Sequence, residues 1–267
     1  FYDSVISNYF NEITNTQFPK KKIIHANLIE KLRYGENAHQ QSAIYSQKDN
    51  LGLIKLHGKT LSYNNYNDVF SALSITKSFP ENVGTVIIKH ANPCGASILK
   101  DKLRSYKSAL ACDPLSAFGG VVSCNFKVSK SLALELNKLF FEVIIGNGFE
   151  KNAVKILKTK KNLRLIDASK FSLDKNLRFN SINTSVLIQS EDNKIFQKKN
   201  FRVVSKKRPS KLQFENLIFA FNICRFVKSN AIVLASNKST IGIGSGQPSR
   251  VDSCLLYTSP SPRDNRV

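Results

Sequence analysis

The sequence has no methionine and no long hydrophobic run. No segment approaches the roughly 20 apolar residues that cross a bilayer, and the N-terminal sequence FYDSVISNYFNEI lacks the basic and apolar regions of a signal peptide. The sequence therefore favours neither membrane insertion nor secretion. Because the chain begins with Phe1 and contains no Met, we expect it to be an internal piece of a longer protein.

Cysteine is also sparse, and the spacing of the cysteines indicates neither a metal site nor a set of disulfides. No two of the five cysteines form a CxxC pair, and their separations match neither a zinc site nor a set of disulfides. We therefore expect reduced thiols in a cytoplasmic protein and no bound metal. The cysteines are Cys94, Cys112, Cys124, Cys224 and Cys254.

Acidic residues are few: 19 Asp and Glu stand against 40 Lys and Arg, which gives a formal charge of +21. Such an excess can mark a nucleic-acid-binding protein. The lysines are scattered in ones to threes, however, with no dense arm and no stripe interleaved with aromatic residues. A basic, solvated surface is the favoured interpretation, and a nucleic-acid-binding module remains the alternative. Anionic small substrates would also be attracted by this charge.

The chain is long enough, and contains enough apolar residues, to form a folded core: 42% of its 267 residues are hydrophobic. Short apolar runs alternate with segments of helical periodicity, which is typical of an α/β fold. The helices are expected at 68–79, 99–110, 129–139, 150–157 and from Glu215 onward. The strands are expected at 85–90, 119–126, 142–146, 162–166, 185–189 and 231–235, with a turn at the NPCG sequence and a polar surface loop at 168–182.

Lys89 and His90 end the apolar run TVII, so both side chains are placed at the carboxyl end of a buried strand, where open α/β sheets bind ligands. A free imidazole titrates near pH ~6.5. The neighbouring ammonium disfavours a second positive charge. His90 could then accept a proton near neutral pH, although an exposed Lys-His pair without function is an equal alternative.

Other polar clusters are each explained as well by local structure. Arg33 and Tyr34, in RYGENAHQ, could grip a phosphate or form a turn. Asn230 could face a cleft or cap the backbone, and Glu142 is an acidic residue at the start of an apolar strand. The segment GIGSGQPSR lacks the third glycine of a dinucleotide-binding loop because Gln247 takes its place.

Taken together, several segments resemble the family of bifunctional purine biosynthesis proteins, in which an inosine monophosphate cyclohydrolase domain is joined to an aminoimidazolecarboxamide ribonucleotide (AICAR) formyltransferase domain. The resemblance covers roughly residues 1–253. It rests on LRYGENAHQ, KTLSYNNYND, VIIKHANPCGAS, DPLSAFGGVVS, FFEVIIGNGF, KKNLRLI, VKSNAIVLA and GIGSGQPSRVDS, in this order.

The resemblance implies formyl transfer from 10-formyltetrahydrofolate to the amine of AICAR, by a three-layer, cytidine deaminase-like α/β domain without a catalytic metal. It also implies a homodimer with sites between its subunits. A non-catalytic, nucleotide-binding remnant of the enzyme is a second alternative, distinguished by the absence of folate-dependent formylation.

The resemblance also implies roles for individual residues. His90 would act as base on the amine, Lys89 would supply positive charge and a proton, and Asn230 would hold the oxyanion. The expected substrate-binding residues are Arg33, Tyr34, Phe118 and Gly119, with Glu142, Gln247 and Arg250 placed near the site.

The sequence departs from the family pattern in its extent. Residues 1–22 resemble only the junction with a cyclohydrolase domain, 23–253 correspond to a truncated formyltransferase domain, and 254–267 are expected to be a non-native, unstructured tail. Ala38 stands where the family usually has Pro. We therefore expect no ring closure from this chain, and an inactive or unstable protein when it is isolated.

Overall fold

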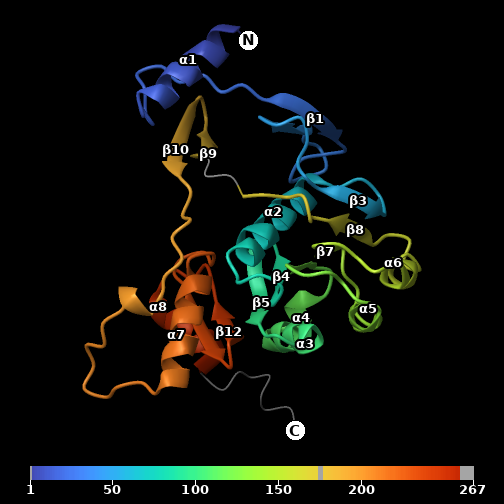
Figure 1. The fold of residues 1–267 in the computed structure, drawn as a ribbon, viewed down its shortest axis with the longest axis vertical. Coiled ribbons are helices and arrows are strands. Elements are labelled where there is room, and N and C mark those ends of the chain that lie inside the picture. The colour runs from blue at the N-terminus through green and yellow to red at the C-terminus, as the bar shows by residue number, and fades with distance from the viewer. Residues whose placement is uncertain (1, 174–176, 259–267) are drawn as a thin grey trace. The chain divides into compact units, whose positions relative to one another are not determined.

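The computed structural model describes residues 2–173 and 177–258, and the chain divides into two compact units at Leu51 and Gly52. The first unit contains helix α1 (Tyr2–Ile13) and an antiparallel pair of strands, β1 (Asn27–Leu32) and β2 (Ser42–Ser46) (Figure 1). The segment between β1 and β2 is a hydrogen-bonded turn, in which the Gly35 N–H donates to the Gln40 carbonyl at 2.8 Å.

The second unit is built on an eight-stranded mixed sheet with the strand order β11-β12-β5-β4-β6-β7-β8-β3 (Figure 1). Strands β6, β7 and β8 are parallel to one another, and every other neighbouring pair is antiparallel. The strands are β3 (Ile54–His57), β4 (Gly84–Lys89), β5 (Asn92–Ile98), β6 (Val121–Cys124), β7 (Val143–Gly146), β8 (Arg164–Asp167), β11 (Ile232–Ser236) and β12 (Ser239–Gly244).

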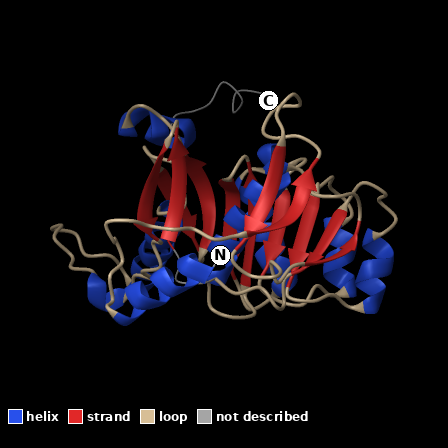
Figure 2. Ribbon diagram, turned by 90° about the horizontal axis from the view of Figure 1, so that it is seen from above, coloured by secondary structure: helices blue, strands red, loops and turns tan. Residues whose placement is uncertain are grey.

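Helices cover both faces of this sheet (Figure 2). Because successive side chains of a strand point to opposite faces, Val86 and Ile88 of β4 pack in one core cluster and Ile87 packs in the other. The first cluster includes α2 (Tyr63–Lys77) and α7 (Lys211–Cys224). The second includes α3 (Lys102–Cys112), α4 (Pro114–Ala117), α5 (Lys130–Leu136) and α6 (Lys151–Leu157).

Three smaller elements complete the described chain. Strands β9 (Leu177–Ile182) and β10 (Ser185–Ser190) pair with each other as an antiparallel hairpin, η1 (Lys198–Asn200) is a single 3-10 turn, and α8 (Arg250–Thr258) follows β12. In the described part of the chain, no helix is long and apolar enough to cross a membrane.

The mixed α/β fold expected from the sequence is confirmed. Strand β4 is almost entirely buried, as its continuous apolar run predicts for a central strand. The expected cap of α5 is also present, since the Ser129 hydroxyl accepts a hydrogen bond from the Leu132 N–H at 3.3 Å.

Two segments inside the domain differ from the expected secondary structure, and the C-terminal segment is a third. Residues 92–98, expected to begin with a turn, form strand β5, which pairs with β4 through a two-residue turn made by His90 and Ala91. Glycine or Asn usually marks such a turn, and neither stands at these positions. Within the expected loop at 168–182, residues 177–182 form β9, which is stabilised by pairing with β10 and not by burial.

The expected unstructured tail begins as helix. Helix α8 continues from Arg250 through residue 254 to Thr258, so the change in composition after Ser253 does not end the helix. The rest of that tail, 259–267, lies outside the described residues.

Candidate functional site

The turns at one edge of the sheet bring most of the predicted site residues together. The end of β4, the start of β5 and the start of β6 meet there, because Lys89 pairs with Asn92 and Ile88 pairs with Val121. Parallel pairing adds the starts of β7 and β8, and antiparallel pairing adds the end of β12 and the start of β11. The segments that carry Lys89, His90, Phe118, Gly119, Glu142, Asn230 and Gln247 therefore flank the same edge.

The sequence placed Lys89 and His90 at the carboxyl end of a buried strand, and both lie at that end of β4. Strand β4 is, however, antiparallel to both of its neighbours. The site edge consequently holds the amino ends of β6, β7 and β8. The β4–β5 hairpin, and not a strand-to-helix crossover, places the Lys-His pair.

Lys89 and His90 have different environments at the end of β4. The Lys89 ammonium donates a hydrogen bond to the Phe118 carbonyl at 2.8 Å, and its side chain is half-buried. His90 is exposed and has a backbone φ of 52°, followed by Ala91 with a φ of 59°. The strand thus fixes the ammonium against a neighbouring loop and leaves the imidazole accessible to a ligand.

The loop that receives Lys89 comes from the predicted DPLSAFGG segment. Phe118 is exposed, and Gly119 adopts a left-handed φ of 72° while its N–H donates to the Phe140 carbonyl at 2.9 Å. Gly120 lies so close to β4 that an added Cβ would come within 2.7 Å of the Ile88 carbonyl oxygen. These glycines allow the loop to approach the end of β4 closely.

Glu142, placed near the site by the family resemblance, contacts two side chains of neighbouring elements. Its Oε2 accepts a hydrogen bond from the Asn65 side-chain amide at 2.7 Å and lies 3.8 Å from the Arg164 guanidinium. Asn65 also completes the capping box of α2, because its Oδ1 accepts from the Ser62 N–H at 3.2 Å. The acidic residue therefore connects the start of β7 to α2 and β8.

Asp68 contacts the turn between β4 and β5. The sequence did not predict it as a site residue. Its Oδ1 accepts a hydrogen bond from the Ala91 N–H at 2.6 Å. Burial raises the pKa of the Asp68 carboxyl above its ordinary value, while the Ala91 N–H and the nearby His90 act in the opposite direction. A single acidic residue in a helical segment has no sequence pattern that points to this contact.

Asn230 is engaged with backbone on the other side of the β4–β5 turn. Its Nδ2 donates to the carbonyls of Gln247 at 3.2 Å and Pro248 at 2.8 Å, and its own carbonyl accepts from the Ser253 hydroxyl at 2.7 Å. The structure thus gives the Asn230 amide the backbone-capping role that the sequence left as one alternative. The Asn230 segment is linked to the turn where the Lys228 N–H meets the Asn92 Oδ1 at 3.4 Å.

Gln247 and Arg250 follow β12. The Gln247 carbonyl receives the Asn230 bonds, whereas its side-chain amide donates to the Ser245 carbonyl at 3.2 Å. Arg250 is exposed at the start of α8. The placement of Gln247 and Arg250 near the substrate stays a prediction.

Arg33 and Tyr34 belong to the first unit. The Arg33 guanidinium lies 5.6 Å from the centre of the Tyr34 ring, and the Tyr34 carbonyl accepts a hydrogen bond from the Ser42 hydroxyl at 2.6 Å. The turn that the sequence favoured for this segment is therefore present. Its role in nucleotide binding stays a prediction.

Three cysteine thiols of the second unit are unsuited to nucleophilic chemistry. Burial raises the pKa of Cys94 to about 12, of Cys112 to about 11 and of Cys124 to about 12. Since the thiolate is the nucleophile, these thiols are unreactive near neutral pH. Among the described residues, no group of three or more His, Cys, Asp or Glu side chains is arranged to hold a metal ion.

We predict that iodoacetamide at pH 8 alkylates Cys94, Cys112 and Cys124 at least ~10²-fold more slowly in the native protein than in urea, because a thiol of pKa about 11 to about 12 is only ~10⁻³ to ~10⁻⁴ ionised at that pH. Mass spectrometry of the alkylated peptides gives the rate for each cysteine. Equal rates in the native and unfolded proteins would contradict the raised pKa of these thiols.

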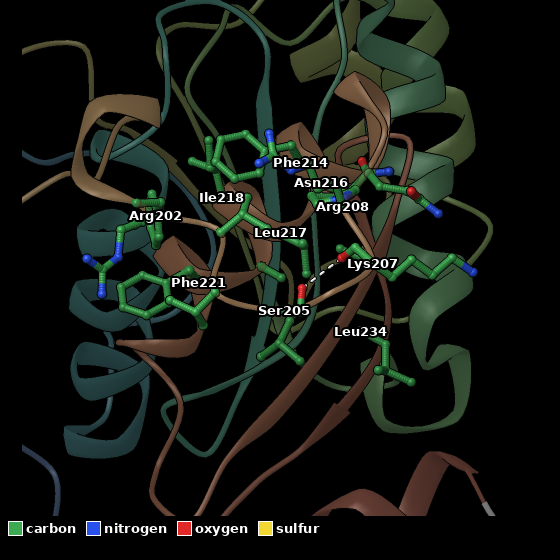
Figure 3. A pocket seen from close by; sticks show the side chains of 18 of the residues that line it. Arg202, Ser205, Lys207, Arg208, Phe214, Asn216, Leu217, Ile218, Phe221 and Leu234 are labelled. Carbon is green, nitrogen blue, oxygen red and sulfur yellow. Dashed lines mark hydrogen bonds between the residues drawn. The ribbon is translucent and has the colours of Figure 1, made fainter.

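A separate pocket of about 930 Å³ lies beside α7 and the outer strand β11 (Figure 3). Phe214, Leu217 and Phe221 contribute apolar surface, and Arg202, Lys207 and Arg208 come from the preceding segment. None of the residues that line it is His, Asp, Glu or Cys. Its lining therefore offers no carboxylate, imidazole or thiol, and the edge of the sheet around Lys89 and His90 remains the candidate site.

A protein family and several curated proteins match almost the whole chain. The family model described as "AICARFT/IMPCHase bienzyme" matches residues 1–258. Similar curated proteins include "Bifunctional purine biosynthesis protein PurH" of Caldicellulosiruptor saccharolyticus, 41% identical over 94% of this chain, and of Leptospira biflexa, 42% identical over 96% of this chain. The chain spans about half the length of these relatives, 50% in both cases.

Proposed function

Because the chain belongs to the AICARFT/IMPCHase bienzyme family, we propose that it is the part that transfers a formyl group from 10-formyltetrahydrofolate to the amine of AICAR, in purine biosynthesis. The observation that carries the proposal is the Lys89-His90 pair. Lys89 is fixed by the Phe118 carbonyl at 2.8 Å, and the adjacent imidazole is exposed at the edge of the sheet.

The chemistry requires a base at this position. An amine conjugated with a carboxamide-bearing ring is a poor nucleophile, so its proton must leave as the nitrogen attacks the formyl carbon. His90 accepts this proton in the proposal, and positioned base catalysis typically contributes ~10²–10⁴-fold. The folate supplies the formyl group.

Lys89 completes the proton balance. As the new carbon–nitrogen bond forms and the bond from the formyl carbon to the folate nitrogen breaks, the departing nitrogen must gain a proton. The Lys89 ammonium supplies positive charge and a proton there. One of its N–H groups is directed at Phe118, which holds the ammonium in place before the substrates bind.

We propose that Asn230 donates to the oxyanion, which requires its side-chain amide to change its hydrogen-bond partners. Its side-chain N–H groups donate to the Gln247 and Pro248 carbonyls. To donate to an oxyanion, the amide must exchange at least one of these bonds for the substrate. We therefore propose that Asn230 shapes the loop in the free protein and turns to the formyl oxygen when substrates bind.

Substrate binding is proposed for Arg33, Tyr34, Phe118 and Gly119, with Glu142, Gln247 and Arg250 nearby. The proposed partners are AICAR, the folate co-substrate and a second copy of the chain in a homodimer. The excess of basic residues favours the approach of a nucleotide phosphate.

The proposal is tested with the full-length product of the open reading frame that encodes this chain. Two reactions are measured separately: tetrahydrofolate release from AICAR and 10-formyltetrahydrofolate, and ring closure of the formylated ribonucleotide. Diethyl pyrocarbonate is then used to modify histidines with and without AICAR, and His57 serves as the internal control.

We expect formyl transfer, and AICAR at ten times its Kd should slow modification of His90 about tenfold while that of His57 is unchanged. Absence of formyl transfer would overturn the assignment. So would a protein that only closes the ring, and in which the formylated ribonucleotide but not AICAR protects His90.

A further inference from the structure

The turn that presents His90 is conformationally demanding. His90 and Ala91 both adopt left-handed backbone conformations, with φ values of 52° and 59°. Such conformations are uncommon for residues with a side chain. This turn therefore needs contacts from outside to keep its shape, and the direction of the His90 side chain depends on that shape.

Two side chains supply these contacts. The Ala91 N–H donates to Asp68 Oδ1 at 2.6 Å. On the other side, the Asn92 amide donates to the His90 carbonyl at 3.1 Å. Asn92 is part of the hairpin itself, whereas Asp68 reaches the turn from α2, so of these two side chains it is Asp68 that connects the turn to a separate element of the core.

Asp68 is itself held firmly. It occupies the middle of α2, where Asn65 and Ala72, three residues before it and four after it on the same face, are buried. The same helix face therefore carries Asn65, which binds Glu142 at 2.7 Å, and Asp68, which binds the turn. Helix α2 packs on β4 and β6. This packing holds the side chains of Asn65 and Asp68 in place.

We propose that Asp68 is a positioning residue for His90: by accepting the Ala91 N–H, it fixes the His90-Ala91 turn and thereby the direction of the imidazole. The catalytic part of this inference rests on the proposed formyl transfer. The structural part, that the carboxyl oxygen holds the turn, does not. An oxygen acceptor is what the turn needs, so the contact does not depend on a negative charge.

Three variants of the full-length protein separate the acceptor from the charge. Asp68→Ala removes the acceptor, and kcat should fall about 10²-fold, as for other small misplacements of a catalytic group, with the KM for AICAR little changed. Asp68→Asn keeps an oxygen at the same place and should restore kcat to near that of the wild type. Asp68→Ala combined with Ala91→Gly should recover much of the lost kcat, because glycine adopts the left-handed conformation without strain.

Hydrogen exchange of the Ala91 amide provides a readout that does not need activity. Protection should be lost in Asp68→Ala and retained in Asp68→Asn. If the wild type shows no formyl transfer, the proposed function fails while this measurement still decides the role of Asp68. Should Asp68→Ala not fold, Asp68→Asn remains decisive.

Loss of Ala91 protection in a folded Asp68→Asn protein would overturn the inference, since the acceptor alone would then be insufficient. Wild-type kcat in a folded Asp68→Ala protein would overturn it equally.

Discussion

Replacing His90 by Ala should lower kcat for formyl transfer by ~10²–10⁴-fold, which is the usual contribution of a positioned general base. The imidazole is exposed at the edge of the sheet, so its removal leaves no cavity in the core. We therefore expect the melting temperature and the affinity for AICAR to stay close to those of the wild type. Lys89→Ala should reduce kcat to a similar extent, because it removes the charge fixed beside Phe118.

His57→Ala is the matched control for this measurement. His57 lies in β3, at the far end of the sheet from β11, and its ring nitrogen contacts the Lys160 carbonyl at 3.2 Å. Its removal should leave kcat unchanged. Near-normal turnover of His90→Ala, measured by tetrahydrofolate release, would remove His90 from the proposed mechanism.

The second large effect concerns stability. Gly95→Ala should destabilise the protein by about 3 kcal/mol or more, at the upper end of what overpacking costs. Gly95 lies in β5 against α3, and an added Cβ would overlap the carbonyl oxygen of Ala109. This atom belongs to helix backbone, so it cannot move aside as the end of a side chain can. For a protein of this size the melting temperature should fall by roughly 6–12 °C.

Gly246→Ala provides the comparison. Gly246 has a left-handed φ of 67°, but nothing lies within 4 Å of an added Cβ. Its substitution should cost only the backbone strain, of about 1–2 kcal/mol. Circular dichroism during heating measures both changes. If Gly95→Ala melted at a higher temperature than Gly246→Ala, the close packing of β5 on α3 would be incorrect.

The sequence was most informative where local chemistry decides the structure. The apolar run from Val86 to Ile88 predicted a buried strand, and Ser129 predicted the start of α5. Both predictions depend on neighbouring residues alone. The turn at His90 and Ala91 could not be found in this way, because it depends on support from Asp68, which is 23 residues away from Ala91.

The same limit applies to the candidate site. The motif segments indicated which residues belong to it, but the contact between Asn65 and Glu142 joins residues 77 positions apart. Asn65 also accepts a capping bond from the Ser62 N–H, which joins residues only three positions apart. Its second bond depends on the packing of α2 beside β7, which no local pattern encodes.

The distribution of burial along β4 has a consequence for how the protein responds to heat. Residues 84–88 are buried in the centre of the sheet, whereas His90 sits in an exposed turn directly beyond them. Regions with few buried contacts open at a lower free energy than the core strands. Loss of turnover on warming would accordingly precede cooperative melting of the domain, and cooling from that interval would restore it.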